Sequence, residues 1–263
     1  MQIERSRRLP LKTKLAFSAG SIEEAMVGAA SMATMLFYNQ VLGLSASLCG
    51  VVFLVASVVD GISDPIVGAY SDQIKSRWGR RHPLMILSAL PLAVSFYCLY
   101  QPPDGLSETG LFAWFLLFMI LIRTAKTFYT VPHGALGAEL TENYHERTSI
   151  FGYNAVVGMV AGTGLGVFIL VVVFPSTPDY SNGLLNEDRY PLLATLGAVV
   201  IVVSLFLCTF GTRDQIPYLH QRPPREIRVR EYFGELRQLL SNRSYLSVCI
   251  SWLVLATSFG ILG

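Results

Sequence analysis

The sequence predicts an all-α membrane protein. Of its 263 residues, 52% are hydrophobic and only 14% are charged, whereas soluble domains carry about a quarter charged residues. Apolar runs of the length that crosses a bilayer, about 20 residues, recur along the chain. These runs lack the period-two alternation of membrane β-barrels, and helices are the other structure that satisfies the backbone in lipid. A soluble globular enzyme is therefore not the expected class.

Seven apolar runs mark the predicted spans. They lie at about Leu15–Leu42, Leu48–Tyr70, Pro83–Tyr100, Leu111–Thr130, Ile150–Phe174, Leu192–Phe210 and from Tyr245 to the end of the sequence. The first run is longer than the apolar part of a signal peptide and has no cleavage pattern after it. We therefore expect it to remain as a span.

The basic residues outside the spans lie almost entirely on one side of the membrane. They occur in segments 1–14, 75–81 and 213–243 and at Arg147, whereas the opposite loops contain only Arg189. Because Lys and Arg are retained on the cytoplasmic side, this predicts a multi-pass protein of the plasma membrane with a cytoplasmic N-terminus. The same placement explains the net charge of +2 by the bilayer, so no nucleic-acid partner is expected.

The spans divide the sequence into four predicted segments. Residues 1–14 form a cytoplasmic tail and residues 15–211 a six-helix transmembrane bundle. Residues 212–243 are polar and interrupted by prolines, which indicates a cytoplasmic linker. Residues 244–263 begin a seventh span that stops before a polar exit. We therefore expect a fragment that contains one bundle and the start of a second, whose remainder is missing.

The second span contains two carboxylates at helical spacing. Asp60 and Asp64 lie four residues apart in VVDGISDPIVG, so a helix places both on one face, about 6 Å apart. Two carboxylates this close are costly to ionise without a cation between them. The pair therefore indicates a site that binds Na⁺ or shares a proton. The alternative is that both acids pair with Arg123 and Lys126 of the fourth span as structural contacts.

The first span also carries two acids, Glu23 and Glu24. Neighbouring helix positions point about 100° apart, so at most one of these side chains faces straight into a central cavity. Arg123 and Lys126 lie three residues apart on one face of the fourth span and can meet either these acids or an anionic substrate. Ionised groups at this depth cost roughly 2.5–3.5 kcal/mol each, so each requires a partner or a function.

No other chemistry is indicated. The sequence has no P-loop, G-x-S-x-G or H-E-x-x-H motif, its four cysteines form no C-x-x-C pair, and its four histidines lack metal-ligand spacing. We therefore expect no enzyme activity, and no cofactor or metal beyond a coupling Na⁺ or H⁺.

Three segments resemble a known family. DGISDPIVGAYSDQIKSRWGRRHPLMI is similar to the second span and following loop of the glycoside-pentoside-hexuronide:cation symporters, the melibiose-permease branch of the major facilitator superfamily. KLAFSAGSIEEAMVGAASMATMLFYNQVLGLS resembles their first span and VPHGALGAELTENYHERT the loop after their fourth. The resemblance implies two six-helix bundles that rock about a central cavity, of which this chain is the N-terminal half.

The resemblance also implies roles for individual residues. The cation-site residues of the family match Asp60, Asp64, Ser63 and Thr127, and its first-span sugar-binding acid matches Glu24. At the substrate site the sequence departs from the family. Thr130 stands where the melibiose permease has a sugar-binding aspartate, Gly134 where it has a stacking tryptophan, and Asn154 lies close to its fifth-span arginine.

The expected function is cation-coupled symport of a sugar, glycoside or hexuronide by alternating access. Glu24 would bind substrate hydroxyls, with Thr130 and Asn154 near the substrate and Lys126 or Arg123 as partners of a hexuronide carboxylate. In the loop after the second span, Asp72 can pair with one of three arginines and hold the cytoplasmic side closed: Arg77, Arg80 and Arg81. The alternatives are a related lysolipid symporter and a membrane solute sensor or scaffold that does not transport.

Overall fold

A computed structural model describes residues 8–74, 76–219, 241, 246–247 and 250–251. The chain divides into two compact units, Met1–Arg222 and Pro223–Gly263, and the architecture below is that of the first unit. The predicted seventh span, and the predicted linker from residue 220 onward, lie almost entirely outside the described residues.

The first span consists of three consecutive segments. They are α2 (Leu11–Ala19), α3 (Ser21–Leu36) and the π-helical turn η1 (Phe37–Val41). Gly20 separates α2 from α3, although its own backbone angles are helical. A Cβ atom at Gly20 would collide with Tyr129 Oη and lie 2.8 Å from His133 Nε2. The missing side chain therefore allows the first span to approach the fourth closely.

Five further helices are long and apolar enough to cross a membrane. They are α4 (Ala46–Gln73), α5 (His82–Leu99), α6 (Glu108–Glu139), α7 (Tyr144–Phe168), which η2 (Ile169–Val173) extends, and α8 (Tyr190–Gly211). Three short 3₁₀ turns complete the described elements: η3 (Gly183–Leu185), η4 (Glu187–Arg189) and η5 (Arg213–Tyr218). With the first span, the described residues form the six-helix bundle that the sequence predicts, and they contain no strand.

Helix starts follow from local sequence. The Ser107 side chain caps α6 by accepting a hydrogen bond from the Gly110 amide, and Asn143 caps α7 in the same way. Prolines occupy the first turns of α5 and α8, where the missing N–H costs nothing. The helices extend beyond the predicted apolar runs because hydropathy marks only the lipid-facing length. The largest difference is in α6, which continues past Thr130 to Glu139.

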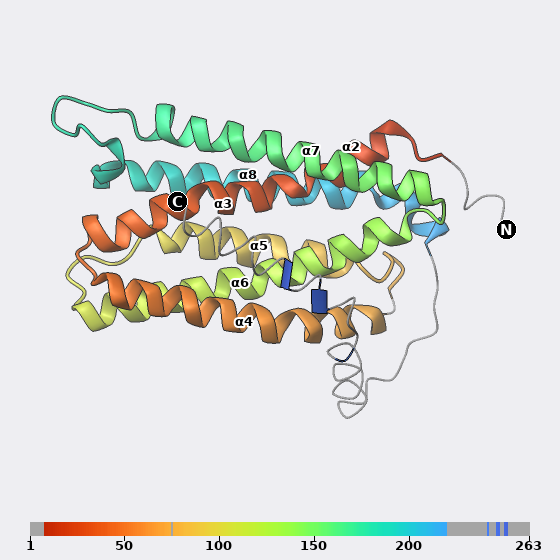
Figure 1. Cartoon of the computed structure of the whole chain (residues 1–263), viewed down its shortest axis with the longest axis horizontal. Coiled ribbons are helices and arrows are strands. Elements are labelled where there is room, and N and C mark those ends of the chain that lie inside the picture. The colour runs from red at the N-terminus through yellow and green to blue at the C-terminus, as the bar shows by residue number, and fades with distance from the viewer. Residues whose placement is uncertain (1–7, 75, 220–240, 242–245, 248–249, 252–263) are drawn as a thin grey trace. The chain divides into compact units, whose positions relative to one another are not determined.

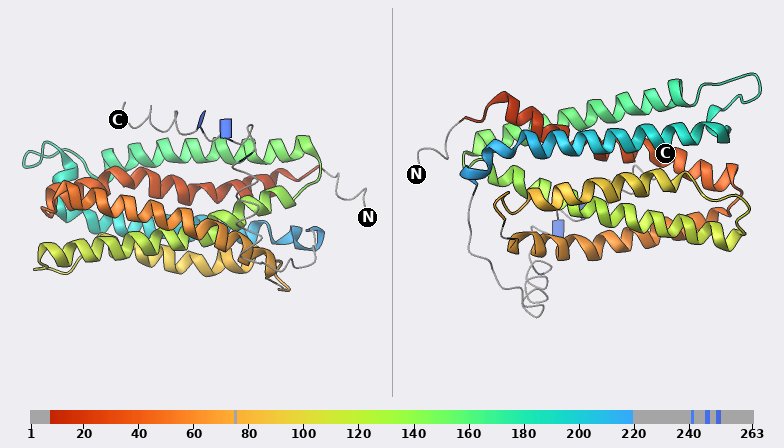
Figure 2. Two further views of the ribbon diagram at one scale, coloured as in Figure 1. Left: turned by 60° about the horizontal axis from the view of Figure 1, so that its bottom comes forward. Right: turned by 180° about the vertical axis from the view of Figure 1, so that it is seen from behind.

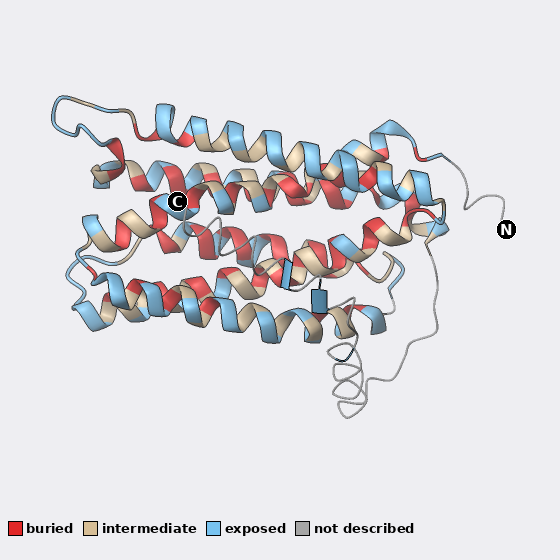
Figure 3. Ribbon diagram, in the orientation of Figure 1, coloured by how far each residue is buried: buried red, intermediate tan, exposed pale blue. Residues whose placement is uncertain are grey.

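The six spans run side by side along a common direction (Figures 1 and 2). α5 packs on α6 and α8, α4 packs on α6, and α7 packs on α2 and α3. α5 is the most buried of these spans, whereas α4 and α7 are the least buried (Figure 3). Gly158 and Gly162 of α7 face Ser21 and Ala25 of α3, so their small size permits this contact.

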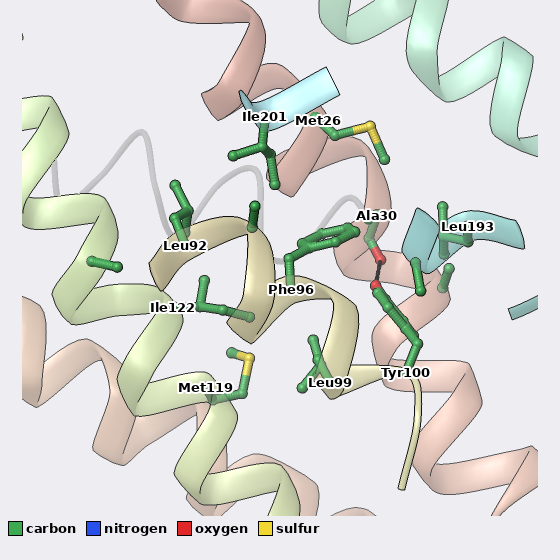
Figure 4. Packing of buried hydrophobic residues seen from close by; sticks show 14 of the residues in the cluster. Met26, Ala30, Leu92, Phe96, Leu99, Tyr100, Met119, Ile122, Leu193 and Ile201 are labelled. Carbon is green, nitrogen blue, oxygen red and sulfur yellow. Dashed lines mark hydrogen bonds between the residues drawn. The ribbon is translucent and has the colours of Figure 1, made fainter. Parts of the chain in front are cut away.

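The core lies where α3, α5, α6 and α8 meet (Figure 4). The Phe96 ring of α5 packs against Gly197 of α8, where a Cβ atom would collide with it. At the end of α5, Tyr100 Oη lies 2.6 Å from Thr34 Oγ1 and donates to the Ala30 carbonyl at 3.3 Å. These contacts fix the first span against the end of α5.

Candidate functional site

Asp60 of α4 forms an ion pair with the fourth span. Its Oδ2 atom lies 2.8 Å from Arg123 Nη1 of α6, and the two side chains are 28% and 31% exposed, respectively. The guanidinium therefore neutralises one member of the predicted carboxylate pair. This is the internal contact that the sequence allowed as an alternative to a purely ion-binding role.

Asp64 is held by hydroxyl groups instead of a base. Thr127 Oγ1 donates to Asp64 Oδ1 at 2.9 Å, and the Ser63 and Thr127 hydroxyl oxygens lie 3.1 Å apart. Ser63 Oγ also lies 3.4 Å from the Asp60 carbonyl oxygen. Among the described residues, Asp64 has no cationic partner. The structure thus brings together the predicted coupling residues around one uncompensated carboxylate.

The spacing of residues on two packed helices produces this cluster. Asp60 and Asp64 are four residues apart on α4, and Arg123 and Thr127 are four apart on α6, so each helix presents two successive turns to the other. Pro65 lies inside α4 directly after Asp64. Because proline has no N–H group, the helix cannot satisfy the carbonyl four residues earlier in the usual way. The cluster therefore lies beside a weakened helical turn.

Glu24 and Glu23 of α3 have opposite environments. Glu24 is two-thirds exposed, and its Oε1 atom lies 3.2 Å from Lys126 Nζ of α6. Glu23 is completely buried, and neither of its carboxyl oxygens has a hydrogen-bond partner among the described residues. Of these adjacent acids on one helix, Glu24 thus has a cationic partner and Glu23 has none among the described residues.

A cavity of about 200 Å³ lies between the first, fourth and fifth spans. Glu23, Glu24, Thr130 and Asn154 line it together with aromatic rings of α2, α6 and α7. Three predicted substrate residues, Glu24, Thr130 and Asn154, therefore share one cavity. The other two, Arg123 and Lys126, do not line it and are bonded to acids.

A compact charge cluster joins the C-terminal end of the second span, α4, to the C-terminal end of the fourth, α6. The Arg81 side chain is 7% exposed and pairs with both Asp72 and Glu139, at 2.8 Å for the latter. It also contacts the Ser71 hydroxyl, and Arg80 pairs with Glu139 at 3.0 Å. Of the three arginines predicted to meet Asp72, the structure thus places Arg81 there.

Two members of the predicted gating set are positioned differently. Arg80 bonds to Glu139, and Arg77 is exposed and makes no ion pair with the described residues. Sequence reasoning missed Glu139 because it ended the fourth span at Thr130. Apart from His133 and the final Glu139, the segment VPHGALGAE contains only apolar and small residues, and this was the available signal that the helix continues.

A further ion pair joins the first span to the fifth. Lys14 Nζ of α2 lies 2.8 Å from Glu146 Oε2 of α7 and 3.0 Å from the Ser149 hydroxyl. The Leu9 amide donates to the same Glu146 oxygen at 3.1 Å. Lys14 lies within α2, although the sequence predicted that the first span starts only after it.

A bundle of apolar helices with paired charges at mid-span defines a class, the multi-pass membrane transporters. Comparison with known proteins gives the family. The family model described as MFS/sugar transport protein matches residues 16–263. The chain therefore belongs to this family, within the glycoside-pentoside-hexuronide:cation branch of the major facilitator superfamily. Membership places it among transporters and not among enzymes.

Three relatives illustrate the range of similarity. An uncharacterized symporter of Synechocystis sp. is 30% identical over 206 residues, which cover 76% of this chain and 36% of the relative. The putative glycoside/cation symporter YagG of Escherichia coli is 25% identical, with coverage of 92% and 50%. The sodium-dependent lysophosphatidylcholine symporter 1-A of Danio rerio is 24% identical, with coverage of 99% and 53%. The chain spans about half the length of such relatives, or less.

Proposed function

We propose that this bundle is the N-terminal part of a cation-coupled symporter that moves a sugar, glycoside or hexuronide across the plasma membrane by alternating access. The observation that carries the proposal is the Asp64 carboxylate, which accepts a hydrogen bond from Thr127 and has no cation beside it among the described residues. Family membership and the relatives named as symporters support the same activity.

In this proposal the coupling ion, Na⁺ or H⁺, binds at Asp64. Asp60, Ser63 and Thr127 supply further oxygen atoms within the same cluster. Binding neutralises Asp64 and favours the substrate-competent state. One charge that moves through a 100 mV potential supplies about 2.3 kcal/mol, which supports roughly fifty-fold accumulation.

The substrate is proposed to bind in the cavity beside Glu24. Its carboxylate accepts hydrogen bonds from sugar hydroxyls, and Thr130 and Asn154 add polar groups from α6 and α7. Lys126 and Arg123 become partners of a substrate carboxylate only when their bonds to Glu24 and Asp60 exchange. A hexuronide therefore requires these two ion pairs to open, whereas a neutral glycoside does not.

The gate is proposed to lie at the Arg81 cluster, on the cytoplasmic side, with the N-terminus on that side as well. Asp72 and Glu139 hold Arg81 between α4 and α6. Access from the cytoplasm requires these contacts to break, and their re-formation closes that side.

The decisive experiment uses the complete protein in proteoliposomes. Uptake of pooled glycosides, pentosides and hexuronides is measured under a Na⁺ gradient, a pH gradient or neither. We expect gradient-dependent accumulation in the parent and its loss in Asp64→Asn. Asp104→Asn is the matched control, because Asp104 is an exposed carboxylate in the loop between α5 and α6 and should leave accumulation unchanged. Accumulation that persists in Asp64→Asn would refute the assignment.

A second candidate substrate is a lysolipid, which the Danio rerio relative favours by its name. Adding lysophosphatidylcholine to the pool tests it directly. The exposed Glu24 and its partner Lys126 favour a hydrophilic solute instead. Tight binding without accumulation under any gradient would indicate a solute sensor or scaffold and would contradict symport.

A further inference from the structure

Glu23 carries a carboxyl group that is not part of the proposed coupling site. It lies on α3 at zero exposure, and both oxygens lack a hydrogen-bond partner among the described residues. It lines the cavity of about 200 Å³, whose described lining includes no residue of α4. The group is therefore separate from Asp60 and Asp64, and this inference does not depend on their proposed role.

The surroundings of Glu23 are aromatic rings together with a few polar side chains. Phe17, Tyr129, His133 and Phe151 contribute rings to the cavity. Asn154 Oδ1 also lines it and likewise lacks a partner. The unpartnered oxygens of Glu23 and Asn154 are acceptors that lack a donated hydrogen, because the Tyr129 hydroxyl, which is also unpartnered, bonds to neither of them.

The ionisable groups near Glu23 are already engaged. On its own helix Glu24 binds Lys126 of α6, so that ammonium is shared with another acid. His133 bonds through Nε2 to the Phe17 carbonyl at 3.0 Å and is stacked on the Phe17 ring at 4.2 Å.

The remaining ionisable neighbours are Tyr129 of α6 and Cys208 of α8. Both lie close to Gly20, where an added Cβ would collide with Tyr129 Oη and lie 3.1 Å from Cys208 Sγ. Neither supplies a positive charge. α7 contributes the uncharged Asn154 to this cavity.

An ionised carboxylate in this position would have neither a cation nor a donor of its own. Burying such a charge costs far more than burying a neutral acid, and the usual resolution is that the group binds a proton. A neutral Glu23 carries an O–H donor on a side chain that faces the cavity containing the unpartnered Asn154 oxygen. One proton therefore removes the charge and supplies the missing hydrogen.

We propose that Glu23 is a proton-binding site, distinct from the coupling site on α4, that holds a proton in this conformation and exchanges it with water when the cavity opens. The exchange converts a carboxylate and a hydronium ion into a carboxylic acid and water, and reverses on release. Glu24, which is two-thirds exposed and lines the same cavity, marks the side from which water reaches it.

The test is infrared spectroscopy of the complete protein in lipid nanodiscs, with the proton itself as the ligand. A carboxylic acid has a carbonyl stretch that a carboxylate lacks. At neutral pH we expect this band in the parent, its loss in Glu23→Gln, and its retention in Glu24→Gln, the matched control on the neighbouring residue. Identical spectra of the parent and Glu23→Gln in this region would overturn the proposal.

Two further measurements complete the test: one variant separates the result from a folding defect, and a transport measurement, which rests on the proposed function, tests the exchange step. Glu23→Asp retains the acid in a changed position, so the band should shift without vanishing; an unshifted band would count against the assignment. In proteoliposomes, Glu23→Gln should lose the component of uptake driven by a pH gradient, while Asp64→Asn loses accumulation altogether. An unchanged pH-driven component in Glu23→Gln would overturn the exchange step.

Discussion

The bundle consists of two halves, α2 to α5 and α6 to α8, that pack alike and carry opposite charges at mid-span. α3 packs on α7 and α8, as α6 packs on α4 and α5, and α5 packs on α8. Exchanging α3 with α6, α4 with α7 and α5 with α8 reproduces these main contacts, as expected for the three-helix repeats of this superfamily. The buried spans α5 and α8 and the exposed spans α4 and α7 correspond in the same way.

Charge does not follow this symmetry. At mid-span the first half supplies the acids Asp60 and Glu24, and the second half supplies the bases Arg123 and Lys126. Near the C-terminal ends of α4 and α6 the signs are reversed, because Arg80, Arg81 and Lys14 of the first half meet Glu139 and Glu146 of the second. The comparison teaches that the two halves share one arrangement of helices. The ion pairs between the halves have opposite polarity at mid-span and near the ends of the spans.

The largest expected effect comes from breaking the contacts of Arg81. Arg81→Gln removes two ion pairs from a nearly buried side chain and should lower the free energy of unfolding by about 3 kcal/mol. Thermal loss of helicity, followed by circular dichroism of the purified protein in nanodiscs, measures the change. Arg77→Gln in the same loop is the control, because Arg77 is exposed and makes no ion pair with the described residues. Equal stability of Arg81→Gln and Arg77→Gln would contradict the stabilising role of the Arg81 ion pairs.

A moderate effect is expected for the mid-span pair Asp60 and Arg123. Asp60→Asn or Arg123→Gln alone leaves an uncompensated charge, whereas the double variant restores neutrality. Because both side chains are about one-third exposed, we expect a coupling energy of about 1 kcal/mol in a double-mutant cycle. Strictly additive changes in unfolding temperature would show that the pair does not link the halves.

The smallest effect is expected for Glu24 and Lys126. Their bond is longer, at 3.2 Å, and Glu24 is two-thirds exposed. Exposed pairs contribute about 0–1 kcal/mol, so Glu24→Gln should leave the unfolding temperature nearly unchanged. A destabilisation as large as that of Arg81→Gln would show that the mid-span pair and the Arg81 ion pairs contribute equally to stability.

The sequence was sufficient to predict the fold class, and it offered the contact of Asp60 with Arg123 as one of its alternatives. Apolar run length alone predicts helical spans. The four-residue spacing of Asp60 and Asp64 predicts that the two acids share a helix face, and the family resemblance implies that Thr127 joins them. The roles of these residues in ion binding remain predictions.

Other features depend on packing between helices and could not be read from one span. The sequence indicates that Glu23 and Glu24 face different directions, but the arrangement of α6, α7 and α8 decides which of them is buried. The close contact at Gly20 could not be predicted either, because it is made with Tyr129 and His133, which lie more than a hundred residues later in the sequence. Glu139 was missed because hydropathy does not mark where a helix ends after it leaves the lipid.

The ion pairs between the halves can form only in the order in which the spans enter the membrane. Synthesis proceeds from the N-terminus, so α3 and α4, with their acids, enter the membrane before α6 brings Arg123 and Lys126. α5, made in between, carries no Asp, Glu, Lys or Arg. Asp60 and Glu24 therefore have no mid-span base to bind until the fourth span arrives. Assembly of the first half is completed by a helix of the second.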